Sequence, residues 1–141
     1  MCIRDRIHPT AGITAIGARM PLVAFNINLA TSDVEVAKKI AKVIRGSSGG
    51  FRSCKAMGFM MEDRGIAQVS MNMVNYEDTP LYVVYEQVRA LAERYGTYIV
   101  DSEIVGLTPA KAMSDCAEFY LKARDFNCHN QIMEYHLLDM K

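Results

Sequence analysis

Uncharged hydrogen-bonding side chains recur at every second position in two segments of this chain, alternating there with apolar residues. They are Asn26, Asn28, Gln68, Ser70 and Asn72. Alternation with a period of two is typical of strands and places all five on one face of a sheet. Asn is depleted in strands because its side chain competes for backbone hydrogen bonds. The cluster therefore favours a surface that binds a polar ligand or partner over a plain solvated face.

Other candidate groups form no recognisable catalytic set. Cys128 and His129 lie near His136, but no fourth residue stands at a zinc-like spacing, so we expect a helix-end cluster and no metal site. Glu103 is a candidate general base, although a lone carboxylate on a strand is more often solvated. His8 precedes a proline near the start and is expected to be exposed. No nucleophile, base and orienting group come together in the sequence.

The elements that must position these residues follow from hydrophobic periodicity and from turn signals. Strands are predicted at 22–29, 53–61, 66–75 and 97–105, and helices after 32, after 79, after 108 and over 131–140. The order is β-α-β-β-α-β with further helices appended. This order predicts an α+β, ferredoxin-like sandwich with an antiparallel sheet, helices on one face and an open second face.

Helix ends and buried faces can also be predicted. Ser32 and Glu35 form a capping box, and Thr79 precedes Pro80 as a second cap. The helix after 108 is expected to turn four residues inward. They are Met113, Cys116, Ala117 and Tyr120.

The hairpin register decides what else lies on the open face. If 62–65 is a four-residue loop, Met61 opposes Ile66 and Lys55 joins the open face with Met57 and Phe59. A loop that is one residue longer or shorter would reverse the whole arm. A face that mixes amides, apolar side chains and one ammonium suits a flat heteroaromatic ligand with an acidic tail.

Composition limits the class of protein. The chain has 141 residues, 16 Lys and Arg against 16 Asp and Glu, and 50% apolar residues, which predicts one folded domain and excludes intrinsic disorder. The zero net charge argues against nucleic-acid binding, as does the absence of stacking aromatic residues on the outward positions of 22–29 and 66–75. No signal peptide, membrane span or C-x-x-C pair is visible, so a cytoplasmic, reduced protein is expected.

Three motifs carry a resemblance to a known family. They are GARMPLVAFNINL at 17–29, GIAQVSMNM at 65–73 and SEIVGLTP at 102–109. From about His8 to its end, the chain resembles the C-terminal subdomain of the transferase domain of glutamate formimidoyltransferases. The resemblance divides the chain into a lead-in at 1–16, whose residues 8–12 would end a folate-site loop, and the subdomain at 17–141.

The resemblance implies a transferase of histidine degradation that moves a formimino group from N-formimino-L-glutamate to tetrahydrofolate. Two α/β halves of such a domain face each other across a folate channel, so the five polar residues would line one wall. Lys55 or Arg19 would meet a glutamate carboxylate, and Arg19 is suited to this because a guanidinium can bind a carboxylate bidentately. Tetrahydrofolate is then a co-substrate, and no metal is implied.

The chain also departs from this family pattern. The catalytic histidine, a proton donor, belongs to the N-terminal half, and neither His8, His129 nor His136 matches its motif. We therefore expect no catalytic residue here, an inactive chain, and a missing N-terminal subdomain or second chain as partner. Residues 1–6 match nothing in the family's lead-in and are expected to be non-native, as in a truncated reading frame.

Two alternatives to half an enzyme remain open. One is a non-catalytic ferredoxin-like binding or regulatory module that pairs through its open sheet face and self-associates into a homo-oligomer. The other, weaker one is a free-standing folate binder.

Overall fold

The computed structural model describes residues 9–10, 12–14 and 16–139. The expectations for residues 1–6, for His8 and for Ala11 in the folate-site loop lie outside these residues. Across the described ranges, no helix combines the length and the apolar character that crossing a membrane would require.

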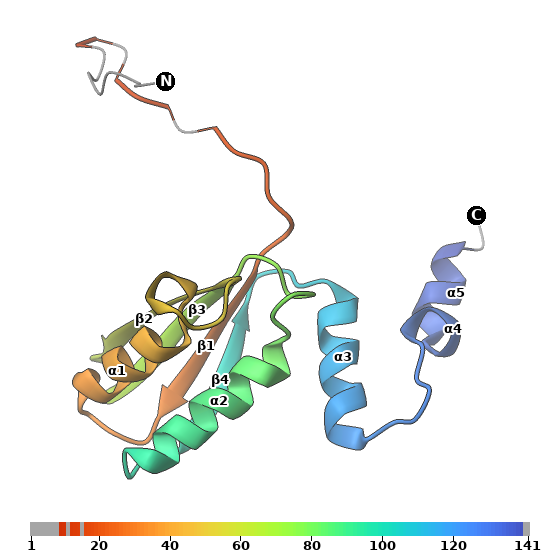
Figure 1. The fold of residues 1–141 in the computed structure, drawn as a ribbon. Helices are drawn as coiled ribbons and strands as arrows, with labels where there is room; N and C mark the ends of the chain where they lie inside the picture. Colours follow the sequence, from red (N-terminus) through yellow and green to blue (C-terminus); the bar gives the residue numbers. More distant parts are fainter. Residues whose placement is uncertain (1–8, 11, 15, 140–141) are drawn as a thin grey trace.

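The chain folds into one four-stranded antiparallel sheet with two helices on one face (Figure 1). The strands, in the spatial order β2-β3-β1-β4, are β1 (Val23–Leu29), β2 (Cys54–Met61), β3 (Ile66–Met73) and β4 (Ile99–Val105). The helices are α1 (Val34–Ile44) and α2 (Leu81–Arg94). This arrangement confirms the ferredoxin-like sandwich, with β1 and β3 at its centre.

The core lies between the sheet and these two helices. Val23, Ile27 and Leu29 of β1 alternate with polar residues and are fully buried against α1 and α2. The facing residues of the other central strand and of α1 are also buried: Ala67, Val69, Met71, Met73, Ala37, Ile40, Ala41 and Ile44. Removing this apolar surface from water is the main stabilisation of the sandwich.

A glycine in the middle of β2 lets α1 lie close to the sheet. A Cβ on Gly58 would lie 2.4 Å from the backbone nitrogen of Lys38 and 2.6 Å from the carbonyl carbon of Ala37. Glycine in a strand interior often marks such a close backbone approach.

The helix caps differ from the prediction by one residue. Asp33 caps α1, and its carboxylate accepts a hydrogen bond from the backbone N–H of Glu35 at 2.9 Å, so Ser32 is not the cap. The negative charge of Asp33 also interacts favourably with the helix dipole. At α2 the cap is Pro80 without a side-chain hydrogen bond, because Thr79 stands one residue too early.

The C-terminal helices leave the sheet on the β4 side (Figure 1). They are α3 (Ala110–Leu121), α4 (Cys128–Gln131) and α5 (Met133–Asp139). The helix expected at 131–140 is therefore present as α5, which begins two residues later, and the short helix α4 precedes it. The rings of Phe119 in α3 and Tyr82 in α2 stack with centroids 4.3 Å apart.

The predicted inward face of α3 is confirmed only in part: Cys116 is half-buried against the core, and Tyr120 packs edge-on against Tyr85 of α2. Met113 is 43% exposed, Tyr120 is 50% exposed and Ala117 is exposed, whereas Ala112 and Ser114 are buried. The helix contacts α2 through its aromatic residues and does not lie on the sheet, so only a narrow part of it is covered.

We expect Gly58→Ala to lower the free energy of unfolding by about 1–3 kcal/mol, because α1 must shift away from β2 to make room for the methyl group. Urea unfolding followed by circular dichroism measures this. Gly17→Ala is the matched control, since a Cβ there meets no atom within 4 Å, and it should change stability by less than about 0.5 kcal/mol. Equal stabilities of the two variants would contradict the close packing.

Candidate functional site

The open face of the sheet carries the side chains that the sequence pattern predicts there. Asn26 of β1 pairs with Ser70 of β3, and Asn28 pairs with Gln68. Asn72 of β3 pairs with Ala24 on the same face. The five polar residues therefore form one continuous group across the two central strands.

The hairpin register is the predicted one. Met61 pairs with Ile66, and Lys55 pairs with Asn72. The side chains of Lys55, Met57 and Phe59 therefore lie on the open face, and all three are exposed. Gly65, in the left-handed region with φ 64°, closes the four-residue loop that sets this register.

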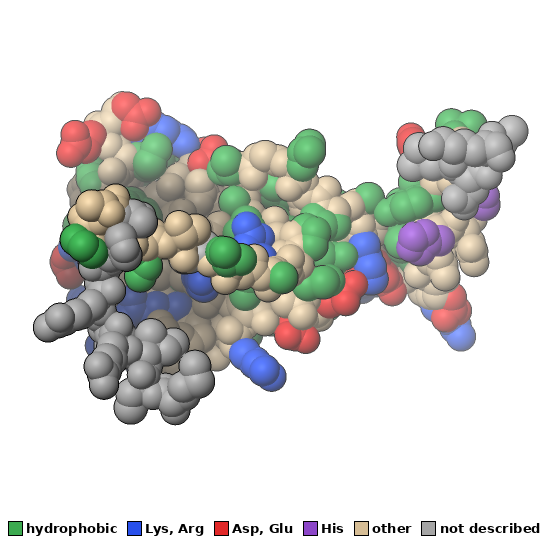
Figure 2. Space-filling view, turned by 90° about the horizontal axis from the view of Figure 1, so that it is seen from above, with side chains coloured by type: hydrophobic (Ala, Val, Ile, Leu, Met, Phe, Trp, Pro, Cys, Tyr) green, Lys and Arg blue, Asp and Glu red, His purple; other side chains and the backbone are tan. Residues whose placement is uncertain are grey.

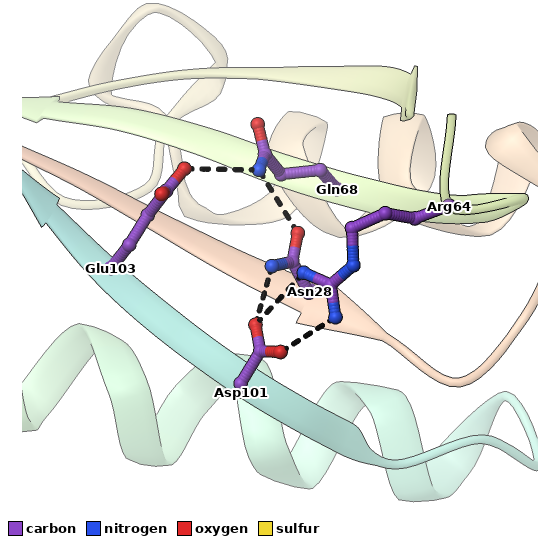
Figure 3. Close-up of polar contacts among 5 residues, drawn as sticks. All are labelled: Asn28, Arg64, Gln68, Asp101 and Glu103. Atoms are coloured by element: carbon purple, nitrogen blue, oxygen red, sulfur yellow. Dashed lines mark hydrogen bonds and ion pairs between the residues drawn. The ribbon is translucent and has the colours of Figure 1, made fainter. Parts of the chain in front are cut away.

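Asn28 is the centre of a hydrogen-bond network on this face (Figure 3). Its Oδ1 accepts a hydrogen bond from Nε2 of Gln68 at 2.9 Å, and its Nδ2 donates to Oδ1 of Asp101 in β4. Arg64, in the hairpin loop, reaches across the sheet to Asp101, with Nη2 2.7 Å from Oδ2. Asn28 and Gln68 are only 3% and 5% exposed, so this part of the face is built into the structure and not freely solvated.

Glu103 belongs to the same face. Its Oε1 accepts a hydrogen bond from Nδ2 of Asn26 at 3.0 Å and a longer one from Nε2 of Gln68 at 3.5 Å. Glu103 is therefore exposed, as expected for a solvated carboxylate, but it is not a lone one, because Asn26 and Gln68 both donate to it. We missed Asp101, Glu103 and Arg64 as parts of one site, although the i, i+2 spacing of the two carboxylates on a strand could have indicated a shared face.

The network keeps one carboxylate ionised. The hydrogen bond from Arg64, followed by that from Asn28, holds the pKa of Asp101 below its usual value. In return, Asp101 raises the pKa of the Arg64 guanidinium. Asp101 thus offers a negative charge and acceptor atoms at neutral pH, and it is not a proton donor.

A hollow of about 590 Å³ lies at the β2 edge of the face. Lys55 lines it together with Arg45 and Arg52 from the connection between α1 and β2. Met57, Phe59, Ser70 and Asn72 line the part that opens onto the sheet. The two arginines were not predicted as site residues.

Arg19 is not brought into contact with these residues in the described part of the chain. It is exposed in the segment before β1 that leads away from the sheet (Figure 1), and its Nη1 donates to the carbonyl of Met20 at 3.2 Å. A role for Arg19 at a ligand carboxylate stays a prediction.

The two described histidines lie away from the sheet. His129 and His136 belong to the small C-terminal lobe formed by α4 and α5 (Figure 2). His129 contacts the ring of Tyr135, and Nε2 of His136 lies 3.1 Å from the carbonyl oxygen of Asn130. Within 9–10, 12–14 and 16–139, no three His, Cys, Asp or Glu side chains gather as a metal site would require.

We expect Arg64→Met to raise the pKa of Asp101 towards its ordinary value, which NMR titration of the carboxyl carbon measures. Because the folded-state pKa of Asp101 is depressed, its contribution to stability is present above the unfolded-state pKa of about 3.9 and is lost as the pH falls through the folded-state pKa. The stability difference between wild type and Arg64→Met should therefore be constant near neutral pH and shrink below about pH 4. An unchanged pKa in the variant would contradict the role of Arg64.

Comparison with known proteins identifies relatives of this chain. Over 133 residues the chain is 60% identical to a glutamate formimidoyltransferase of Streptococcus pyogenes serotype M1, covering 94% of this chain and 44% of that protein. It is 48% identical to a glutamate formimidoyltransferase of Thermoplasma acidophilum over 117 residues, covering 83% and 39%. A formimidoyltransferase-cyclodeaminase of Gallus gallus is 43% identical over 120 residues, covering 81% and 22%.

The chain thus spans less than half the length of each of these relatives. The model of the formiminotransferase domain matches residues 24–138, which include β1 except its first residue, the other three strands and most of the helical lobe. The chain therefore belongs to the formiminotransferase domain family.

Proposed function

We propose that this chain is the folate-binding half of a glutamate formimidoyltransferase and that its open sheet face forms one wall of the substrate channel. The observation that carries the proposal is the ordered polar face, in which Asn28, Gln68 and Asp101 are fixed by mutual hydrogen bonds. The part of the same face that carries Asn72 and Met57 is exposed and open to a ligand. The names of the relatives support the transfer of a formimidoyl group linked to glutamate, and tetrahydrofolate as its acceptor is what the resemblance of the three sequence motifs implies.

The face has the groups that a folate needs. A folate joins a flat heteroaromatic pterin, rich in donors and acceptors, to a benzoyl ring and a glutamate. The amides of Asn26 and Asn72 and the hydroxyl of Ser70 supply hydrogen bonds, while Met57 and Phe59 supply apolar surface for the rings.

The cation at the edge of the face completes the set. Lys55 lies on the open face beside Asn72 and offers its ammonium to a ligand carboxylate. Arg19, in the segment before β1, is proposed as a second cation that binds a ligand carboxylate.

This half binds and orients substrate but does not supply the proton for the reaction. Transfer forms a C–N bond to a folate nitrogen and breaks the C–N bond to the glutamate nitrogen, which leaves as an amine after taking up a proton. On the described face, Asp101 is held ionised by Arg64, and no histidine lies on the sheet. The proton donor is therefore expected from an N-terminal half, on a second chain or on an adjoining part of the same enzyme.

A regulatory module that pairs through the same face is the second candidate. Met57 is 60% exposed and Phe59 is 45% exposed, which gives the face apolar surface that a partner sheet could cover. Such a module would self-associate through Asn26, Asn28 and Met57 and would bind no folate.

The purified chain should show no formimino transfer above background, because no proton donor is positioned on the open face among the residues that the structure describes. Adding the N-terminal half of the transferase domain of the Streptococcus pyogenes relative should restore transfer. Formation of the formimino-folate product measures this activity. Turnover by the chain alone would contradict the proposed division of labour. Self-association without folate binding, seen by sedimentation and by titration with folinic acid, would favour the regulatory module.

Asn72→Ala should weaken binding of folinic acid about three- to tenfold, since it removes an exposed hydrogen-bonding group beside Lys55 at the hollow. The free energy of unfolding should change by less than about 0.5 kcal/mol, because Asn72 is exposed. Gln87→Ala, at an exposed polar residue of α2 on the opposite side of the sheet, is the control and should bind like wild type. Unchanged binding in Asn72→Ala would remove this residue from the wall.

A further inference from the structure

The two edges of the open face carry side chains of opposite charge. On β4 the face carries the carboxylates of Asp101 and Glu103. At the β2 edge it carries Arg45, Arg52 and Lys55, which line the hollow described above. Since the whole chain has a net charge of zero, this separation is a local property of the face and not a general field.

The cations of the hollow have no carboxylate partner among the residues the structure describes. Nε of Arg45 donates to Oγ of Ser48 at 2.7 Å, and neither Arg52 nor Lys55 lies within ion-pair distance of a described Asp or Glu. Elsewhere in the chain, cations such as Arg89 are ion-paired. Three unpaired cations in one hollow form a site for a ligand with more than one carboxylate.

The opposite edge has a carboxylate prepared as an acceptor. Asp101 is neutralised by Arg64, but Glu103 has no cation within ion-pair distance in the described ranges. Asn26 and Gln68 both donate to Oε1 of Glu103, which fixes the carboxylate and leaves Oε2 without a described hydrogen bond. A carboxylate held in this way can accept hydrogen bonds at Oε2 from a ligand N–H group, such as the 2-amino group or N3–H of a pterin.

The register places the two ends a defined distance apart. Glu103 pairs with Asn26, Asn26 with Ser70, and Ser70 with Met57, and Lys55 lies two residues along β2. With strands about 4.8 Å apart and a rise of about 3.4 Å per residue, the backbones at Glu103 and Lys55 are about 16 Å apart. The intervening surface is apolar and amide-bearing, as an aromatic spacer requires.

We propose that the face binds folate in one orientation, with the pterin at Glu103 on the β4 side and the glutamate carboxylates in the hollow of Arg45, Arg52 and Lys55. The benzoyl ring then crosses the sheet beside Met57. This inference rests on the proposed function and adds Glu103, Arg45 and Arg52 as specificity-determining residues. It also places the reacting end of the folate over β1 and β4, so the second half must bring its proton donor to that side.

Two fragments of folate test the orientation on the full 141-residue chain. The probes are 6-methylpterin, which lacks the acidic tail, and p-aminobenzoyl-glutamate, which lacks the pterin; NMR chemical-shift titration measures both dissociation constants. Arg52→Gln should weaken binding of p-aminobenzoyl-glutamate about three- to tenfold and leave that of 6-methylpterin unchanged. Glu103→Gln, which keeps the shape of the side chain, should do the reverse.

Matched controls remove the same charges elsewhere. Arg94→Gln, at the end of α2, and Glu134→Gln, on α5, are both exposed and away from the open face, so both should bind the two probes like wild type. Thermal unfolding shows whether each variant is folded. If Arg52→Gln does not fold, Lys55→Met provides a second test of the hollow.

The outcomes separate the orientation from the proposed function. An exchanged pattern, in which Glu103→Gln affects only p-aminobenzoyl-glutamate, would overturn the orientation while folate binding stands. The orientation would also be overturned if every variant bound both probes as tightly as wild type while wild type still bound folinic acid. A wild-type chain that binds neither folinic acid nor the fragments would remove the proposed function itself.

Discussion

The pairing of β1 with β3 is the constraint on which the rest of the structure depends. Because neighbouring side chains on a strand point to opposite faces, one register assigns Ile27 and Val69 to the helices and Asn28 and Gln68 to the open face. A shift by one residue would exchange the two sets, expose the core and bury the amides. The apolar core therefore stabilises the polar surface, since neither can form without the other.

The polar surface is fixed by its own hydrogen bonds as well. Buried amides must be paired, and Asn28 meets this requirement through Gln68 and Asp101, while Arg64 connects the hairpin loop to β4. Three strands and one loop are joined in this way at one end of the face. A surface so constrained loses little conformational entropy when a ligand binds, which suits a wall that must orient a substrate.

The chemistry of the face explains why it is proposed as half of a site. It offers amides, an ionised carboxylate and unpaired cations, all of which bind and orient, but its Asp101 is held away from proton donation. The relatives that the chain matches are more than twice as long. A division in which one half holds the folate and the other supplies the proton agrees with both observations.

The sequence by itself determined the order of the elements, the core residues of the strands and the face on which the amides lie, because alternation and turn residues act over short distances along the chain. The hairpin register stayed conditional on the loop length until the pairing of β2 with β3 fixed it. Only the tertiary structure decided that Asp101 and Glu103 join those amides, since β4 comes to lie beside β1 through a connection of some 70 residues. The hollow with Arg45 and Arg52 and the partial burial of α3 also depend on how helices and loops pack. Such contacts carry no local sequence signal, and this is why the open face could be predicted while its charge distribution could not.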